Sequence, residues 1–317
     1  MFRFSTIFIN LCLICLTAFP AASHGNPNRV NFNVKCQDIE FNNRIMGIYA
    51  ASGEEVSIEV IAPADANEFD MLYNDVAVTD RTAIGWQWIA PEKAGLHSLI
   101  IRHKTTKETM TLNVFVLIPF SAIKDGQLKG CRIGEYPSIP LKYKKRDYQD
   151  PKGLIEVTPE NEETFISPNF QLKQFICKQP QDYPKYVVLS SKLLIKLELI
   201  IDALNDNGIK CSSFTIMSGY RTPHYNEAIG NVKFSRHIYG TAADFFIDES
   251  PVDGKMDDLN KDGKIDIQDA KAIYDVIESL SKDPAYNYYL GGLSAYKKNA
   301  AHGPFVHIDV RGYRARW

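Results

Sequence analysis

The chain lacks the features that would direct it to nucleic acid or hold it in a membrane. Its 36 lysine and arginine residues are balanced by 38 aspartate and glutamate residues, giving a net charge of −2. No basic surplus is therefore present for nucleic acid or anionic lipid. Beyond an apolar run near the N-terminus, no segment approaches the length of a membrane span. Internal repeats and low-complexity tracts are also absent, so the 317 residues predict an ordinary globular protein of two domains.

The N-terminus has the organisation of a secretory signal peptide. Arg3 precedes the apolar run at residues 7–19, and the small residues Ala21, Ala22 and Ser23 follow it. We expect cleavage near Ser23, which makes residues 1–23 a signal peptide and the mature protein secreted or periplasmic.

Cysteine is scarce. Removal of the signal peptide leaves four cysteines, namely Cys36, Cys131, Cys177 and Cys211. An even count in an exported protein predicts two disulfides, with three connectivities open. We expect Cys36 to pair with Cys131 and Cys177 with Cys211, because each pair then stays within one domain. No C-x-x-C spacing remains, which disfavours zinc binding by these thiols.

Residues 26–118 predict an all-β domain. Residues 55–61 alternate cleanly between polar and apolar, and turn signals at 51–53 and 91–95 separate the apolar segments. Short strands at this spacing are typical of an immunoglobulin-like sandwich, with a small barrel as the alternative. Such a domain could carry a protein partner. By alternation Trp86 and Trp88 share one face, where they either pack in the core or form a sugar-stacking platform.

Residues 119–163, rich in Lys, Pro, Gly and Tyr without clear periodicity, predict a connector, and residues 164–317 predict an α+β domain. A helix is expected over residues 190–207, with leucine and isoleucine on one side and Gly208 as its C-terminal cap. Strands follow it, so we expect helices packed on one side of a small antiparallel sheet. The fold class is therefore multi-domain, with a β-sandwich followed by an α+β domain.

Three separated residues carry metal-binding chemistry: His237, Asp244 and His307. Two imidazoles and one carboxylate form the ligand set of a catalytic zinc site, which leaves the fourth position for water. Alternation over 305–311 predicts a strand that places His307, Asp309 and Arg311 on one face and apolar residues on the other. A ligand, a carboxylate and a guanidinium on one face are typical of a cleft.

The surrounding segments are SGYRTP at 218–223 with Asn226, SRH at 235–237 with Gly240, Ala242 and Asp244, and HIDVRG at 307–312. Together they resemble the M15 family of zinc peptidases, which contains D-alanyl-D-alanine carboxypeptidases and peptidoglycan endopeptidases. The resemblance covers roughly the last half of the chain. It implies that His237, Asp244 and His307 hold zinc, that Arg221 contacts substrate, and that the substrate is a peptidoglycan stem peptide.

One position departs from that family. Many members carry an acid three residues before the last histidine ligand as general base, and here that position is Pro304. Asp309 and His302 are the nearby replacements, and we favour Asp309 on the same strand face. Its alternative role is to orient His307 or to pair with Arg311. The missing acid leaves a rival function open: a non-catalytic cell-wall or partner-binding protein with a structural zinc.

A second metal motif lies between the zinc ligands. Residues 258–269 place side-chain oxygen donors at positions 1, 3, 5, 9 and 12, with Gly263 at position 6 and a backbone carbonyl at position 7. The expected calcium ligands are Asp258, Asn260, Asp262, Lys264, Asp266 and Asp269. The pattern resembles an EF-hand or dockerin-type loop followed by a helix, within an insertion at 253–270. Asp269 replaces the usual glutamate, and an acidic solvated loop is the alternative.

Overall fold

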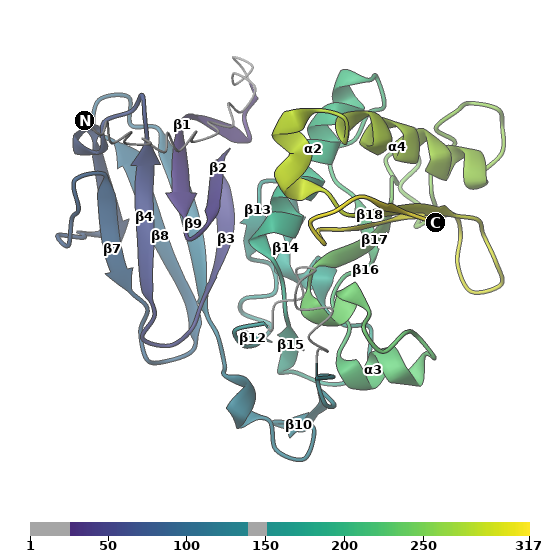
Figure 1. Cartoon of the computed structure of the whole chain (residues 1–317), viewed down its shortest axis with the longest axis horizontal. Helices are drawn as coiled ribbons and strands as arrows, with labels where there is room; N and C mark the ends of the chain where they lie inside the picture. The colour runs from purple at the N-terminus through teal and green to yellow at the C-terminus, as the bar shows by residue number, and fades with distance from the viewer. Residues whose placement is uncertain (1–25, 139–150) are drawn as a thin grey trace, which may run out of the picture.

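A computed structural model describes residues 26–138 and 151–317 of the chain. The expected signal peptide and residues 139–150 of the expected connector lie outside the described residues. Two halves lie side by side: an N-terminal half built of strands, and a C-terminal half of helices around a second set of strands (Figure 1). No helix among the described residues is long and apolar enough to cross a membrane.

Two sheets make up the N-terminal half. Their strands are β1 (Arg29–Cys36), β2 (Ile39–Asn43), β3 (Ile45–Ala50), β4 (Glu55–Ile61), β5 (Phe69–Tyr73), β6 (Val76–Ala77), β7 (Gly85–Ile89), β8 (Gly95–His103) and β9 (Thr109–Val116), with a short 3-10 helix η1 (Ala66–Glu68) before β5. One sheet has the order β2-β1-β4-β7 and the other β3-β9-β8-β5-β6. The pairs are antiparallel except β3 with β9, which run parallel.

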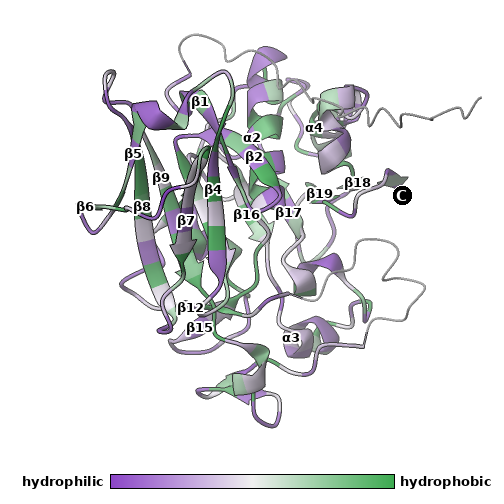
Figure 2. Cartoon of the chain, turned by 60° about the vertical axis from the view of Figure 1, so that its left-hand side comes forward, coloured by the Kyte–Doolittle hydropathy of each residue, from purple (hydrophilic) through white to green (hydrophobic). Residues whose placement is uncertain are grey.

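The two sheets pack face to face. Hydrophobic and hydrophilic residues alternate along strands such as β4 and β8 (Figure 2), so each sheet presents one apolar face. Phe32 of one sheet lies 4.7 Å from Phe69 of the other, measured between ring centroids. Trp86 and Trp88 are 0% and 6% exposed, which confirms that they pack in the core and leaves no platform for a sugar.

The C-terminal half is built around a five-stranded sheet of order β16-β17-β19-β18-β20. Its strands are β16 (Thr215–Ser218), β17 (Ala242–Phe246), β18 (Gly292–Tyr296), β19 (Phe305–Asp309) and β20 (Ala315–Arg316). The first four strands pair antiparallel, as predicted, whereas β20 runs parallel to β18. Shorter paired strands surround this sheet: β10 (Gln127–Leu128) with β11 (Cys131–Arg132), β12 (Ile155–Val157) with β15 (Lys185–Val187), and β13 (Phe165–Ser167) with β14 (Phe170–Gln171).

Helix α4 (Ile267–Leu280), with α2 (Ser191–Asp206) packed on it, covers one face of the five-stranded sheet, whereas α3 (Pro223–Ala228) lies apart from these two helices (Figure 1). The 3-10 turns that follow η1 are η2 (Phe120–Ala122), η3 (Leu172–Phe175), η4 (Arg236–Tyr239) and η5 (Pro284–Tyr289). Helix α4 packs against β18 and β19. The bounds of α2 confirm the helix expected over 190–207, with Ser190 at its N-cap and Gly208 beyond its end at φ +78°.

The two halves share one continuous hydrophobic core among the described residues. Polar contacts reinforce the junction. The Ser191 hydroxyl at the start of α2 donates to the buried Gly47 carbonyl at 2.8 Å, and the Asn113 amide donates to the Phe165 carbonyl at 2.8 Å. The β-rich half therefore forms a fixed support for the helix that backs the C-terminal sheet.

The predicted disulfides do not form. Cys36, Cys131, Cys177 and Cys211 are all buried free thiols. Keeping each pair within one half was the wrong criterion, because Cys131 lies on the β10–β11 hairpin, where its thiol donates to Gln181 Oε1 at 2.7 Å. This hairpin belongs with the C-terminal half rather than with the strand that carries Cys36.

Lys196 links α2 to the strand that carries His307. The residue is 2% exposed, and its Nζ donates to the main-chain carbonyl of Asp309 at 2.8 Å. Burial lowers the pKa of Lys196 to about 7, although the nearby Asp309 carboxylate opposes the shift. Between this value and the ordinary lysine pKa, an unfolded chain binds a proton that the folded chain does not.

We predict that the contribution of Lys196 to stability rises with pH between about pH 7 and 10, by at most ~1.4 kcal/mol per pH unit. Lys196→Met removes this titration. The free energy of unfolding of the wild type, minus that of the variant, should therefore increase over this range in urea titrations. The partly exposed Lys192→Met on the same helix is the control. If the difference in free energy of unfolding between the wild type and Lys196→Met does not change with pH, the lowered pKa of Lys196 is contradicted.

Candidate metal centre

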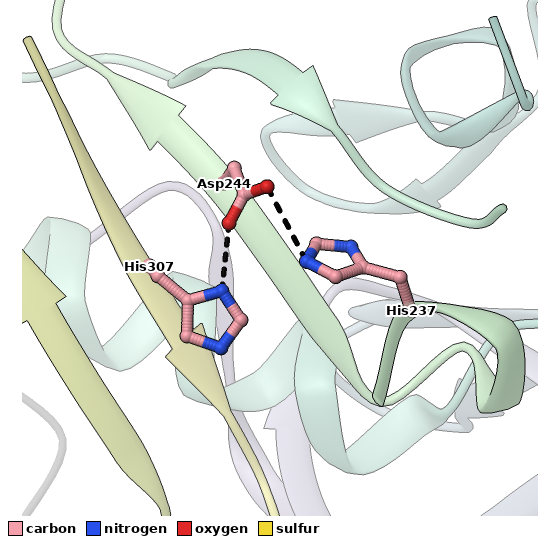
Figure 3. A group of neighbouring side chains, drawn as sticks. All are labelled: His237, Asp244 and His307. Atoms are coloured by element: carbon pink, nitrogen blue, oxygen red, sulfur yellow. Dashed lines mark hydrogen bonds and ion pairs between the residues drawn. The ribbon is translucent and has the colours of Figure 1, made fainter. Parts of the chain in front are cut away.

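His237, Asp244 and His307 converge on one face of the five-stranded sheet (Figure 3). His237 lies on η4, Asp244 on β17 and His307 on β19. One ligand atom from each residue lies within 4.8 Å of the others, and all three side chains are buried. Asp244 and His307 stand directly opposite each other in the antiparallel β17–β19 ladder, so their side chains share a face.

The Asp244 carboxylate is the common partner in this cluster. Its Oδ1 lies 2.7 Å from His307 Nδ1, and its Oδ2 lies 3.3 Å from His237 Nε2. Arg221 Nη2 also donates to Oδ2 at 2.6 Å, while Arg221 Nε donates to the Ser218 hydroxyl at 2.8 Å. Arg221 is therefore a buried residue tied to a ligand, not a surface turn residue.

His237 is oriented by the backbone around it. Its Nδ1 lies 2.7 Å from the Gly219 carbonyl, so Nδ1 carries a proton, and Nε2 is the ring nitrogen that points at Asp244. Gly240 then ends η4 in the left-handed conformation at φ +63°. A Cβ atom there would lie 2.2 Å from the Val188 carbonyl oxygen, so the tight turn from His237 to Asp244 requires glycine.

Asp309 lies behind His307. One of its oxygen atoms is 3.6 Å from His307 Nε2, the nitrogen that faces away from Asp244. The carboxylate is fully buried and accepts hydrogen bonds from the Gly292 amide at 2.8 Å and from the Arg311 amide and guanidinium. Burial would raise the pKa of Asp309, but the contacts with His307 and Arg311 outweigh it and hold the pKa well below its usual range.

The charges in the cluster are strongly coupled. Burial would raise the pKa of Asp244, yet the two histidines overcome this effect and keep that pKa far below normal. Burial lowers the pKa of His237, which favours the neutral imidazole. Burial also acts to lower the pKa of His307, but hydrogen bonds to Asp244 and Asp309 raise it to about 9. In the metal-free protein a proton on His307 therefore balances the buried carboxylates.

The donor set fits zinc. His237 Nε2, an Asp244 oxygen and His307 Nδ1 supply two nitrogen atoms and one oxygen atom, the combination found in catalytic zinc sites. Both histidines have their second ring nitrogen near an oxygen acceptor, the Gly219 carbonyl for His237 and the Asp309 carboxylate for His307. Such outer contacts fix the ring and strengthen the ligand.

A cavity of about 470 Å³ is lined by residues that neighbour this cluster in sequence, although none of the three candidate ligands lines it. Met217 and Phe246 line it from β16 and β17, within two residues of Ser218 and Asp244. The opposite walls come from the loop at 298–304, which includes His302 and Pro304, and from the insertion after β17. The partly buried His302 ring is fixed by contacts of its Nε2 with Asn299 Nδ2 and of its Nδ1 with the Gly303 carbonyl, both at 2.8 Å.

The predicted calcium loop is closed by hydrogen bonds from its backbone amides to its own carboxylates. The Asp258 carboxylate accepts hydrogen bonds from the amides of Asp262 and Gly263, so the chain curls around it. The fully buried Asp269 accepts from the Leu259 amide at 2.8 Å and shares a capping box with Asp266 at the start of α4. Among the described residues, however, the loop carboxylates do not converge as the His237 group does.

Residues 168–261 match the family described as Peptidase M15. This segment contains His237 and Asp244, whereas His307 lies beyond it. The match supports a peptidase domain of that family in the C-terminal half, as the three sequence segments suggested. The chain has no match among curated proteins.

Two residues of the cluster were not assigned a role from the sequence. Ser218 anchors Arg221, and the Gly219 carbonyl fixes the tautomer of His237. Both lie in the SGYRTP segment that carried the resemblance. The role of Gly219 depends on where η4 packs, which the local pattern does not encode, whereas the contact of Ser218 with Arg221 lies within one short segment.

We predict that zinc binding at pH 6 releases about one proton per zinc ion, because the protonated His307 must become neutral to act as a ligand. Apparent affinity should therefore rise with pH up to about 9, the pKa of His307. Calorimetry in two buffers of different ionisation enthalpy gives the proton count. The His302→Ala variant should release the same number of protons per zinc ion. Zinc binding without proton release would contradict the raised pKa of His307.

Proposed function

We propose that the mature chain is an exported zinc-dependent peptidase that hydrolyses amide bonds in peptidoglycan stem peptides. The observation that carries this proposal is the buried His237–Asp244–His307 group, set beside a cavity within a domain that matches Peptidase M15. The peptidoglycan substrate rests on the family resemblance, and export rests on the signal-peptide pattern of residues 1–23.

The residues around the site have different roles, which follow from their positions. A bound zinc ion would supply Lewis acidity toward water and the scissile carbonyl. Arg221 fixes the Asp244 carboxylate through Nη2 and is placed to hold a substrate carbonyl or carboxylate beside it. The apolar walls of the cavity at Met217 and Phe246 would exclude water from the adjoining part of the substrate.

The contacts of Asp309 support the orienting role that the sequence left open. Its oxygen atoms are already engaged with Arg311 and Gly292, and its low pKa makes it a weak proton acceptor near neutral pH. His302 is then the better candidate for general base. Its ring lies on the cavity wall, and its Nε2 contacts a neutral amide, Asn299 Nδ2, whereas Asp309 is paired with a guanidinium.

We predict that three variants differ in zinc binding and in turnover. His237→Ala should lose zinc and all cleavage of muropeptides. His302→Ala should keep its zinc and lose about 10²- to 10⁴-fold in kcat. Asp309→Asn should weaken zinc affinity about 10- to 100-fold, with turnover largely restored at saturating zinc.

Zinc content and muropeptide cleavage on the same preparations provide the measurement, with the exposed Lys297→Ala in the same loop region as control. Full zinc affinity with collapsed kcat in Asp309→Asn would instead make Asp309 the base. Stoichiometric zinc in the wild type without cleavage of crosslinked or uncrosslinked muropeptides would favour the rival function. That rival is a non-catalytic cell-wall or partner-binding protein, and Pro304 at the usual acid position is the feature in its favour.

We also propose that the loop at 258–269 binds a structural calcium ion and that the N-terminal sheets form an immunoglobulin-like sandwich for positioning or for a protein partner. The wrapping of the loop around Asp258 supports the first proposal. Ile265 of this loop lines the cavity, so an ordered loop would define one wall of the substrate site.

We predict that Asp262→Ala lowers thermal stability only when calcium is present. At calcium 100-fold above its Kd the wild type should gain about 2.7 kcal/mol, a gain that the variant lacks. Lys264→Ala is the matched control, because it keeps the backbone carbonyl that would bind the ion. Thermal unfolding with and without calcium tests this, and an equal loss in calcium-free buffer would remove the calcium site from consideration.

A further inference from the structure

Trp317 is an exposed aromatic residue in contact with the candidate metal centre. The chain has three tryptophans, and the other two, Trp86 and Trp88, are buried in the N-terminal half. The side chain of Trp317 is 55% exposed, yet its ring centroid lies 5.4 Å from that of His307. A large apolar surface is therefore open to solvent beside a metal ligand.

The indole is held in place from several sides. Its Nε1 donates to the Tyr296 hydroxyl at 2.6 Å, and the Arg311 guanidinium lies 5.1 Å from the ring centroid. The Ser294 hydroxyl donates to the Trp317 carbonyl at 2.5 Å. Gly292 leaves room for the ring, since a Cβ atom there would lie 2.7 Å from it. A ring fixed in this way loses little conformational freedom when a ligand covers it.

Trp317 extends a row of side chains that crosses the sheet. Ser218 stands opposite Asp244, Asp244 opposite His307, and His307 opposite Ser294 in successive strand pairs. The parallel β18–β20 pairing and the hydrogen bond from Ser294 then place Trp317 at the β20 end of this row. A substrate centred on the ligands would meet Arg221 toward the β16 side and the indole toward the β20 side.

We propose that Trp317 is a substrate-binding residue whose indole stacks on an uncharged part of a peptide held at the metal centre. The proposal rests on the peptidase function proposed above. The surface beside the ring carries no free charge from Arg311, because Asp309 accepts hydrogen bonds from its guanidinium group. A peptide amide plane or a small apolar side chain next to the scissile bond matches an indole of this kind.

Steady-state kinetics on zinc-loaded protein test the role. Trp317→Ala should raise KM for a stem-peptide muropeptide about three- to tenfold, with kcat little changed, while Trp317→Phe stays near the wild type. Tyr288→Ala removes another exposed aromatic, stacked against Lys192, and should change neither constant. Loss of zinc from Trp317→Ala, or a fall in kcat at unchanged KM, would overturn the proposal, because Trp317 would then be supporting His307.

Tryptophan fluorescence supplies a readout independent of turnover. Titration of the zinc-loaded wild type with the same muropeptide should change the emission in a saturable way, because Trp317 is the exposed tryptophan of the three. Trp317→Phe, which keeps Trp86 and Trp88, should show no change. Cleavage by the wild type without any emission change, or an equal change in Trp317→Phe, would exclude Trp317 from the binding site.

The two readouts separate this inference from the proposed function. An emission change without cleavage would reject the peptidase and keep the binding role of Trp317. A comparison of stem peptides with and without their attached disaccharide identifies which part of the ligand contacts the indole. The KM effect of Trp317→Ala should be equal for both, and an effect confined to the disaccharide form would replace the peptide by a sugar ring and overturn the proposal.

Discussion

The buried carboxylate of Asp244 sets the constraint on which the C-terminal half depends. A carboxylate this deep in the protein costs several kcal/mol unless charges and donors surround it. Arg221 and His307 do so, and His237 contacts the same carboxylate oxygen as Arg221; each of the three comes from a different segment. The SGYRTP segment, η4 and β19 must therefore all reach β17 for the fold to be stable, and the same requirement assembles the ligand set.

Features encoded locally were predictable from the sequence. Leucine and isoleucine at helical spacing, with Ser190 before them and Gly208 after them, defined α2 almost to the residue. Strand alternation likewise placed His307 and Asp309 on one face and Val306 and Ile308 in the core of β19. The ligand set followed from the resemblance of three sequence segments to the M15 family, and zinc chemistry fitted the residue types that those segments carry.

Features that depend on long-range packing were not predictable. The thiol of Cys131 was assigned to the wrong half because nothing near it in sequence indicates that its hairpin joins the segment around Gln181. The parallel strand β20 has only two residues, too few for a period. The engagement of Asp309 by the Gly292 amide similarly arises only when β18 lies beside β19. In each case the deciding contact joins residues far apart in the chain.

Metal binding at this centre depends on the register of the central sheet. Asp244 and His307 are cross-strand partners on β17 and β19, and a shift of one residue in either strand would send the two side chains to opposite faces. Chelation is thus available only to the correctly aligned sheet. A metal ion bound by this pair would stabilise only the native strand register. It would therefore favour that register over shifted ones while the domain folds.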